Sequence, residues 1–183
     1  MNTIENKKTL FTSVKDGETF KIGDMEFIKF PSVNGQTPAV MKNIAFHSRF
    51  GGNNDLRSSD VLRKMEECIL PKIIAAVGKE NLCIIKTDLT TLDGPNPYGT
   101  MESLISLPTL DFFRANVEIF DLYNPGIWWW LATPESAMPR AKPFWVLCVS
   151  PSGYFDYDGF INYGFGVRPF CIFNSSIFES SEE

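Results

Sequence analysis

The sequence predicts a single soluble domain of the α+β class, and three observations carry that prediction. A self-consistent β-hairpin lies near the N-terminus, a serine-capped helix follows it, and the last third alternates short apolar runs with turn residues. The 183 residues are 44% hydrophobic, enough for one sizeable core. We expect one domain over residues 16–175, a flexible N-terminus over 1–15 and an acidic tail over 176–183.

The hairpin is predicted over Glu18–Phe30. A Gly-Asp pair at 23–24 suits a two-residue turn of type II′. In that register Phe20 faces Phe27 on one side, while a lysine faces a glutamate on the other. Apolar and charged pairs both fall in consistent places, so the pattern supports its own register.

A helix is predicted to begin at Ser58 or Ser59, because a serine hydroxyl accepts a hydrogen bond from the first free backbone N–H groups. Apolar residues then recur at helical spacing to about Ile69. Pro71 is expected to break or kink this helix, and Gly78 is expected to end it.

The remaining expected elements are short. They are strands at 39–46, 82–86 and 103–107, a helix capped by Thr109 that runs to about Asn116, and strands at 127–133, 144–149, 154–158 and 167–173. In the tryptophan run, Trp128 and Trp130 share one face of the strand, and Trp129 shares the other with Leu131. We expect the Trp128 and Trp130 pair in the core and Trp129 to be the more exposed ring.

Charge argues against a nucleic-acid partner, and the lack of a long apolar stretch argues against a membrane. The formal net charge is −5 and the isoelectric point is about 5.0, whereas a protein that binds phosphate backbones normally has a basic face. We therefore expect no nucleic-acid partner. No stretch approaches the roughly 20 apolar residues that span a bilayer, and residues 1–15 lack a signal-peptide pattern. We expect no membrane insertion and a cytoplasmic location.

The sulfur and imidazole groups suggest neither a metal site nor a cofactor. Each cysteine lies in an apolar run and is predicted to be a buried thiol; the four are Cys68, Cys83, Cys148 and Cys171. A disulfide between the last two stays open, although the expected compartment argues against it. There is no C-x-x-C pair, and His47 is the single histidine, so zinc ligation is not predicted.

No catalytic residues are predicted. His47 has no nucleophile elbow to act with, and the adjacent glycines at 51–52 lack the lysine of a phosphate loop. The Asp-x-Asp-Gly run at 156–159 lacks the further ligands of a calcium loop. Arg168 is either a carboxylate clamp or a structural arginine, and its neighbours Pro169 and Phe170 favour the structural role.

The segment 154–165 is the candidate binding surface. It interleaves aromatic rings with Asp, Asn and Gly, the mixture that binding surfaces favour. The residues predicted to contact a ligand are Tyr154, Asp156, Tyr157, Asp158 and Tyr163. The alternative is an ordinary strand with half of its aromatic side chains buried.

Two late motifs carry a family resemblance. Trp129–Pro134 reads WWLATP, and Gly166–Pro169 reads GVRP after a Ser-Gly turn at 152–153. This resembles a bacterial and prophage family of unknown function with the signature Trp-Trp-Leu-Arg-(Ser/Thr)-Pro followed by Gly-Val-Arg-Pro. Ala132 stands where that family usually has arginine. The resemblance covers about residues 16–173; its earlier parts are Gly17–Phe30, Ser58–Leu70 and motifs within 87–99.

That family is similar in pattern to the C-type-lectin-like superfamily, which includes formylglycine-generating enzymes and variable proteins of diversity-generating retroelements. The resemblance implies a small twisted antiparallel sheet, two flanking helices and long loops. From the aromatic segment 154–165 and the lack of a catalytic constellation, we expect a non-enzymatic module that binds a glycan or a surface protein. Two alternatives stay open: a structural part of a phage particle or surface assembly, and a cryptic thiol enzyme of the formylglycine-generating type.

Overall fold

The computed structural model describes residues 11–179, and the strands there form three sheets, so the α+β class is confirmed. In spatial order, the four-stranded sheet contains β1 (Thr19–Ile22), β2 (Met25–Lys29), β3 (Gln36–Met41) and β11 (Phe170–Asn174). The five-stranded sheet contains β4 (Phe46–Ser48), β10 (Phe165–Val167), β7 (Trp129–Pro134), β8 (Trp145–Val149) and β9 (Phe155–Phe160). A separate hairpin pairs β5 (Ile85–Asp88) with β6 (Thr100–Ser103).

The pairing is antiparallel throughout the described sheets except between β10 and β7, which run parallel. The expected antiparallel sheet is therefore a mixed arrangement of two larger sheets. A parallel neighbour needs a long connection. Here the chain travels out through β8 and β9 before it returns as β10 beside β7.

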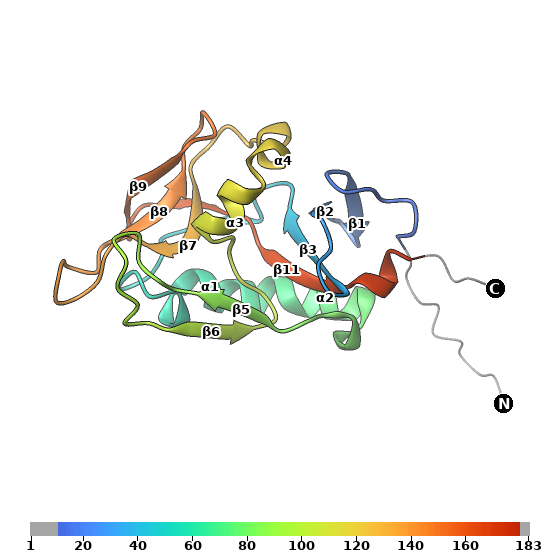
Figure 1. Ribbon diagram of the computed structural model, residues 1–183, viewed down its shortest axis with the longest axis horizontal. Coiled ribbons are helices and arrows are strands. Elements are labelled where there is room, and N and C mark those ends of the chain that lie inside the picture. The colour runs from blue at the N-terminus through green and yellow to red at the C-terminus, as the bar shows by residue number, and fades with distance from the viewer. Residues whose placement is uncertain (1–10, 180–183) are drawn as a thin grey trace.

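Helices cover both sides of these sheets (Figure 1). On one side a continuous helix runs through α1 (Asp60–Lys64), a π-helical stretch (Met65–Ile69) and α2 (Leu70–Val77). On the other side lie α3 (Leu110–Ala115) and α4 (Val117–Leu122). Short 3-10 turns occur at Leu56–Ser58, Lys79–Asn81 and Ser175–Ile177.

Two apolar clusters correspond to these layers. The larger cluster packs Val61, Met65 and Ile73 of the long helix against residues of both larger sheets, Trp130 among them. The smaller one packs α3 and α4 against the opposite faces, where Trp129 lies. Both larger sheets therefore contribute side chains to both clusters.

The N-terminal hairpin has the predicted register. Phe20 pairs with Phe27, and Ile22 pairs with Met25 across the turn. Gly23 has a φ of 62°, and Asp24 is not among the residues with positive φ, as a type II′ turn requires. Local chemistry was therefore sufficient to predict this element.

Ser59 is the cap of the long helix, and its hydroxyl accepts a hydrogen bond from the Leu62 N–H at 3.0 Å. The break expected at Pro71 is absent. The helix instead widens into the π stretch, where the Leu70 N–H donates to the Met65 carbonyl, five residues back. A wider turn accommodates the proline ring, which would clash with the carbonyl of a regular α-helix. Gly78 ends the helix as predicted.

Two expected strands are each divided between the larger sheets. The segment 39–46 becomes the end of β3 and the start of β4, and the segment 167–173 becomes the end of β10 and then β11. The chain crosses at residues 42–45 and at the Arg168-Pro169 pair. Pro169 has no N–H to offer a ladder, so a continuous strand through it is disfavoured.

Other boundaries also move. The strands expected at 82–86 and 103–107 are β5 and β6, and each begins three residues away from its expected start. Thr109 caps α3 as predicted, by accepting a hydrogen bond from the Phe112 N–H at 3.2 Å. The helix α4 was not predicted.

The folded part of the chain extends beyond the expected limits 16–175. The Phe11 N–H donates to the Ile177 carbonyl at 2.7 Å, and Phe178 packs edge-on against Phe20. Ile177 and Phe178 are buried, so the start of the expected acidic tail belongs to the core. The expected flexible residues 1–10, and residues 180–183, lie outside the described part.

The tryptophan prediction was wrong on which ring is exposed. Trp129 is 1% exposed, whereas Trp128 is 37% exposed. The α3–α4 layer covers the Trp129 face of β7, and Trp128 lies just before the strand. Trp128 and Trp130 do share a face, because both contact the Phe165 ring.

Candidate functional site

A continuous row of partly exposed aromatic rings crosses the five-stranded sheet. We call it the aromatic stripe; its members, in spatial order, are Trp145, Phe160, Tyr163, Phe165 and Trp128. Successive ring centroids are 5.2, 5.7, 5.3 and 5.4 Å apart. Residues distant in sequence are thus assembled on one surface by β8, β9, β10 and the residue before β7.

The stripe has a rigid base and an open outer side. Phe165 packs on the buried Trp130 with centroids 4.6 Å apart. The Trp130 indole N–H donates to the Ser48 carbonyl at 2.9 Å, which holds that ring in place. Trp128 and Trp145 are each 37% exposed, and Tyr163 is 47% exposed. Rings fixed from below lose little conformational freedom when a ligand covers them.

The structure separates the five predicted ligand residues. Tyr163 lies in the aromatic stripe, where it contacts Phe160 and Phe165. Tyr154 is 75% exposed and borders a different pocket with Asp121 and Asn124. Sequence proximity within 154–165 therefore did not mean one shared surface.

The other three predicted residues belong to β9, which is an edge strand. β9 advances from Asp156 to Gly159 while β8 advances only from Cys148 to Val146, so β9 carries a bulge at Tyr157 and Asp158. The Asp156 carboxylate accepts a hydrogen bond from the Asp158 N–H at 2.8 Å. Bulge and carboxylate both hinder the addition of a further strand at this edge.

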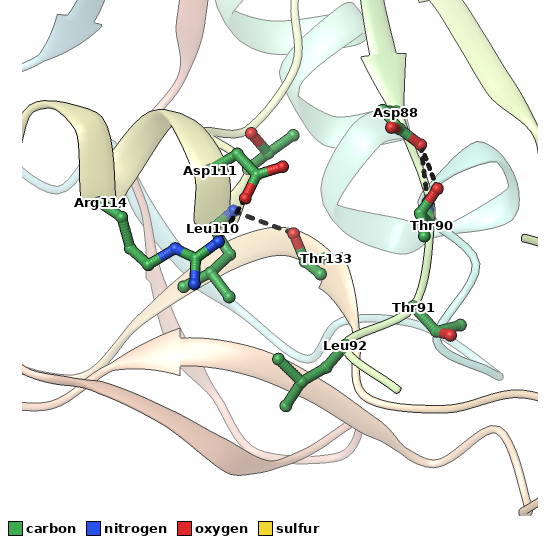
Figure 2. Close-up of a pocket in the computed structure, with 9 residues that line it drawn as sticks. Asp88, Thr90, Thr91, Leu92, Leu110, Asp111, Arg114 and Thr133 are labelled. Atoms are coloured by element: carbon green, nitrogen blue, oxygen red, sulfur yellow. Dashed lines mark hydrogen bonds and ion pairs between the residues drawn. The ribbon is translucent and has the colours of Figure 1, made fainter. Parts of the chain in front are cut away.

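A polar pocket lies between the end of β5 and α3 (Figure 2). Its volume is about 180 Å³. Asp88 and Thr90 line one side, Asp111 and Arg114 project from α3 on the other, and Thr133 lies between them. Thr133 belongs to the WWLATP motif, so this pocket is where that motif meets the loop that follows β5.

The polar pocket satisfies many of its own groups. Asp88 accepts hydrogen bonds from the Thr90 N–H at 2.9 Å and the Thr90 hydroxyl at 2.6 Å. The Arg114 guanidinium donates to Asp111 at 2.7 Å. The Thr133 hydroxyl accepts a hydrogen bond from the backbone of α3. The pocket can accept hydroxyl groups, but its groups are already paired with one another.

Arg168 has the structural role favoured from the sequence. Its side chain is 0% exposed and donates to the Met41 and Lys42 carbonyls, both at 3.0 Å. A third, longer bond at 3.4 Å reaches the Tyr123 carbonyl at the end of α4. The guanidinium therefore ties the two crossing segments to the helical layer.

The thiols differ in exposure, contrary to the prediction that all four are buried. Cys68 is exposed on the π stretch, whereas Cys148 and Cys171 are fully buried. Burial raises the pKa of Cys148 to about 12 and raises the pKa of Cys171 further. All four are free, so the disulfide considered between Cys148 and Cys171 is absent.

The histidine and the acidic groups offer little further chemistry. His47 is exposed on β4, with Nδ1 3.3 Å from the Gly164 carbonyl oxygen. Within residues 11–179 no group of three or more metal-binding side chains comes together. Over the same residues, none of the helices is both long and apolar enough to span a bilayer.

Comparisons with protein-family models, with curated proteins and with solved structures found no match to this chain. Its surface chemistry must therefore be interpreted from its own residues.

Sequence reasoning missed most of the aromatic stripe. Phe160 and Phe165 lie within the segment that was singled out, but Trp128 was assigned to the core and Trp145 was not assigned to the site. The available signal was the density of aromatic residues in three separate segments. Only the strand order shows that those segments meet.

Proposed function

We propose that this chain is a non-enzymatic binding module that takes a neutral glycan on the aromatic stripe. The observation that carries the proposal is the unbroken ring contact from Trp145 to Trp128 on an exposed surface. Isolated exposed apolar residues are ordinary, whereas a contiguous exposed patch marks an interaction site. The rings supply apolar faces and edges, and sugar rings present apolar C–H groups that pack against such faces.

Polar groups next to the stripe suit the hydroxyl groups of a sugar. His47 lies beside Gly164 in the loop between β9 and β10, and Asn162 is exposed in the same loop. Tyr163 itself carries a hydroxyl that can donate and accept. The formal net charge of −5 opposes an acidic glycan over long range and so favours a neutral one.

The geometry also disfavours one common way of binding a peptide. Strand addition would use the free edge of β9, and the bulge at Tyr157 and Asp158 disrupts that edge. The Asp158 N–H is already bonded to the Asp156 carboxylate. A ligand that lies across exposed ring faces is therefore favoured over a strand that extends the sheet.

We extend the proposal to the fold family. A C-type-lectin-like relationship is supported by sheets with helices on both sides and by the position of the late motifs. WWLATP forms β7, and GVRP covers the end of β10 and the crossing to β11 in the other larger sheet. A solved relative with a different order of these strands would contradict this part of the proposal.

The test is glycan binding by stripe variants. Tyr163→Ala and Trp145→Ala should each weaken binding about tenfold or more, because loss of an aromatic anchor in a binding surface commonly costs about 2 kcal/mol. Tyr154→Ala is the matched control, since this ring is 75% exposed and lies outside the stripe. A glycan array identifies the ligand, and titration calorimetry then measures each dissociation constant.

Two results would contradict the proposal. One is wild-type protein that binds no neutral glycan on the array. The other is equal binding by wild type and both stripe variants when circular dichroism shows them folded. Stripe variants that lose binding to a protein but never bind a glycan would leave the surface correct and the ligand class wrong.

A further inference from the structure

Two buried N–H donors without acceptors meet at one crevice, on the face opposite Trp130. They are Nη1 of Arg168 and Nε1 of Trp129, the two such side-chain atoms within residues 11–179. Arg168 is 0% exposed and Trp129 is 1% exposed. Both residues line the crevice, and the guanidinium carbon lies over two aromatic rings, 4.8 Å from the centroid of Trp129 and 5.7 Å from that of Phe120. Buried donors normally have acceptors, so this pair requires an explanation.

The crevice lies between α4 and the turn that joins β8 to β9. It is too narrow for a water molecule as it stands. Its rim consists of Asp121, Asn124 and Gly153. The same three residues border an outer pocket of about 290 Å³, together with Tyr154. The outer pocket therefore leads to the two donors.

The floor of the crevice is positively charged and has no counter-ion. No carboxylate within residues 11–179 forms an ion pair with Arg168, and burial lowers its pKa to about 10. With that pKa the guanidinium stays charged at neutral pH. Carbonyl groups accept the bonds from Nε and Nη2, which leaves Nη1 as the unused arm of the fork.

One rim side chain is held and the other is free to move. Asn124 donates to the Pro151 carbonyl at 3.0 Å and accepts from the Gly126 N–H at 3.1 Å. Asp121 is exposed, and within residues 11–179 its side chain has no hydrogen bond or ion pair. Rotation of the Asp121 side chain would widen the entrance without disturbing the backbone.

We propose that this crevice recognises a carboxylate group, which receives hydrogen bonds from Nη1 of Arg168 and Nε1 of Trp129. A carboxylate oxygen is the acceptor that matches a buried guanidinium arm, and both donors belong to residues that line the same crevice. The rest of the ligand lies in the outer pocket beside Tyr154. Asp121 opposes binding, because its negative charge stands at the entrance. The site is separate from the aromatic stripe.

Indole resonances report on this site directly. The chain has four tryptophans, and Trp129→Phe identifies the Nε1–H cross-peak of Trp129 in a nitrogen–proton correlation spectrum. Sodium acetate and sodium glucuronate are the probes, and sodium chloride at equal ionic strength is the control. We expect a saturable shift of the Trp129 cross-peak with the carboxylates and none with chloride. The Trp128 and Trp145 cross-peaks should stay in place.

Three variants sharpen the test. Asp121→Asn removes the opposing charge and should tighten binding severalfold. Arg168→Lys keeps a positive charge but loses the planar fork, so the saturable shift should disappear in a protein that circular dichroism shows to be folded. Tyr163→Ala alters the aromatic stripe alone and should leave the carboxylate titration unchanged, which separates this proposal from the glycan proposal.

The two probes, acetate and glucuronate, also distinguish the source of the carboxylate. Equal titration by acetate and glucuronate indicates a small free carboxylate. Tighter binding of glucuronate that Tyr154→Ala abolishes indicates a sugar acid held by the outer pocket. The proposal is overturned if the Trp129 cross-peak is unmoved in both the wild type and Asp121→Asn. It is also overturned if chloride produces the same shift, or if folded Arg168→Lys keeps it.

Discussion

At the scale of single residues, close packing beneath the aromatic stripe sets the strongest constraint. Gly159 in β9 lies directly against Trp130 and the β8 backbone. A Cβ there would overlap the Val146 carbonyl oxygen and lie 2.8 Å from Cζ3 of Trp130. Because Trp130 in turn supports Phe165, the absence of a side chain at Gly159 determines how the stripe sits on the sheet.

Gly159→Ala should destabilise the protein by about 1–3 kcal/mol, as for other overpacked core positions. The methyl group would meet the backbone, a fixed indole and, at 3.3 Å, the Cys148 Sγ. In a domain of this size each kcal/mol lowers Tm by about 2–4 °C. The matched control is Gly164→Ala, because a Cβ at Gly164 meets nothing within 4 Å. Thermal melts in which both variants match the wild type would refute the close approach.

At the scale of elements, the long helix depends both on a local capping residue and on packing of its apolar face against the core. Its start follows the local rule, since the Ser59 hydroxyl accepts from the Leu62 N–H. Its middle does not, because Pro71 is accommodated by the π stretch and the helix continues to Val77. Ile69 and Ile73, on either side of Pro71, are both buried in the larger cluster. Burial of that apolar face stabilises the helix on both sides of the proline.

Ser59→Ala should reduce the free energy of unfolding by about 1 kcal/mol through loss of the helix cap. The neighbouring Ser58→Ala is the control, since Ser58 is exposed and its hydroxyl makes only a 3.5 Å contact with the Asp55 carbonyl. Urea denaturation of both variants measures the difference. An equal loss of stability in the two would contradict the assignment of the cap to Ser59.

At the scale of the whole molecule, two sheets are joined into one unit by paired crossings. The connection from β3 to β4 and the connection from β10 to β11 run side by side. The Arg168 side chain, from the second connection, donates hydrogen bonds to carbonyls of the first connection and to a carbonyl at the end of α4. The two apolar clusters therefore share their supporting strands. We expect the domain to unfold cooperatively, with both larger sheets losing their packing in the same transition.

Cysteine labelling reads out that cooperativity. In the native protein iodoacetamide should modify exposed Cys68 readily and half-buried Cys83 slowly, because burial raises the Cys83 pKa. Cys148 and Cys171 belong to the buried core and should react only on global unfolding, so their rates should rise together with urea. Mass spectrometry of digests measures each site. Rapid native labelling of Cys148 would contradict the packing and would revive the thiol-enzyme alternative.

The sequence by itself determined the features that depend on near neighbours. The hairpin register, the Ser59 and Thr109 caps and the helix end at Gly78 each follow from side chains within a few residues of the feature. The buried, carbonyl-bonded character of Arg168 was also anticipated, since its neighbours in the chain are apolar. Such features need no knowledge of what packs against them.

Only the tertiary structure decided which faces are covered and which segments meet. Strand alternation separates Trp129 from Trp128 and Trp130 but does not say that helices cover both faces of β7. It cannot divide 167–173 between two sheets, nor bring Trp128 and Trp145 into one stripe with Tyr163. The physical reason is that burial depends on contacts between residues distant in sequence, whereas a periodic pattern records only the two faces of a strand.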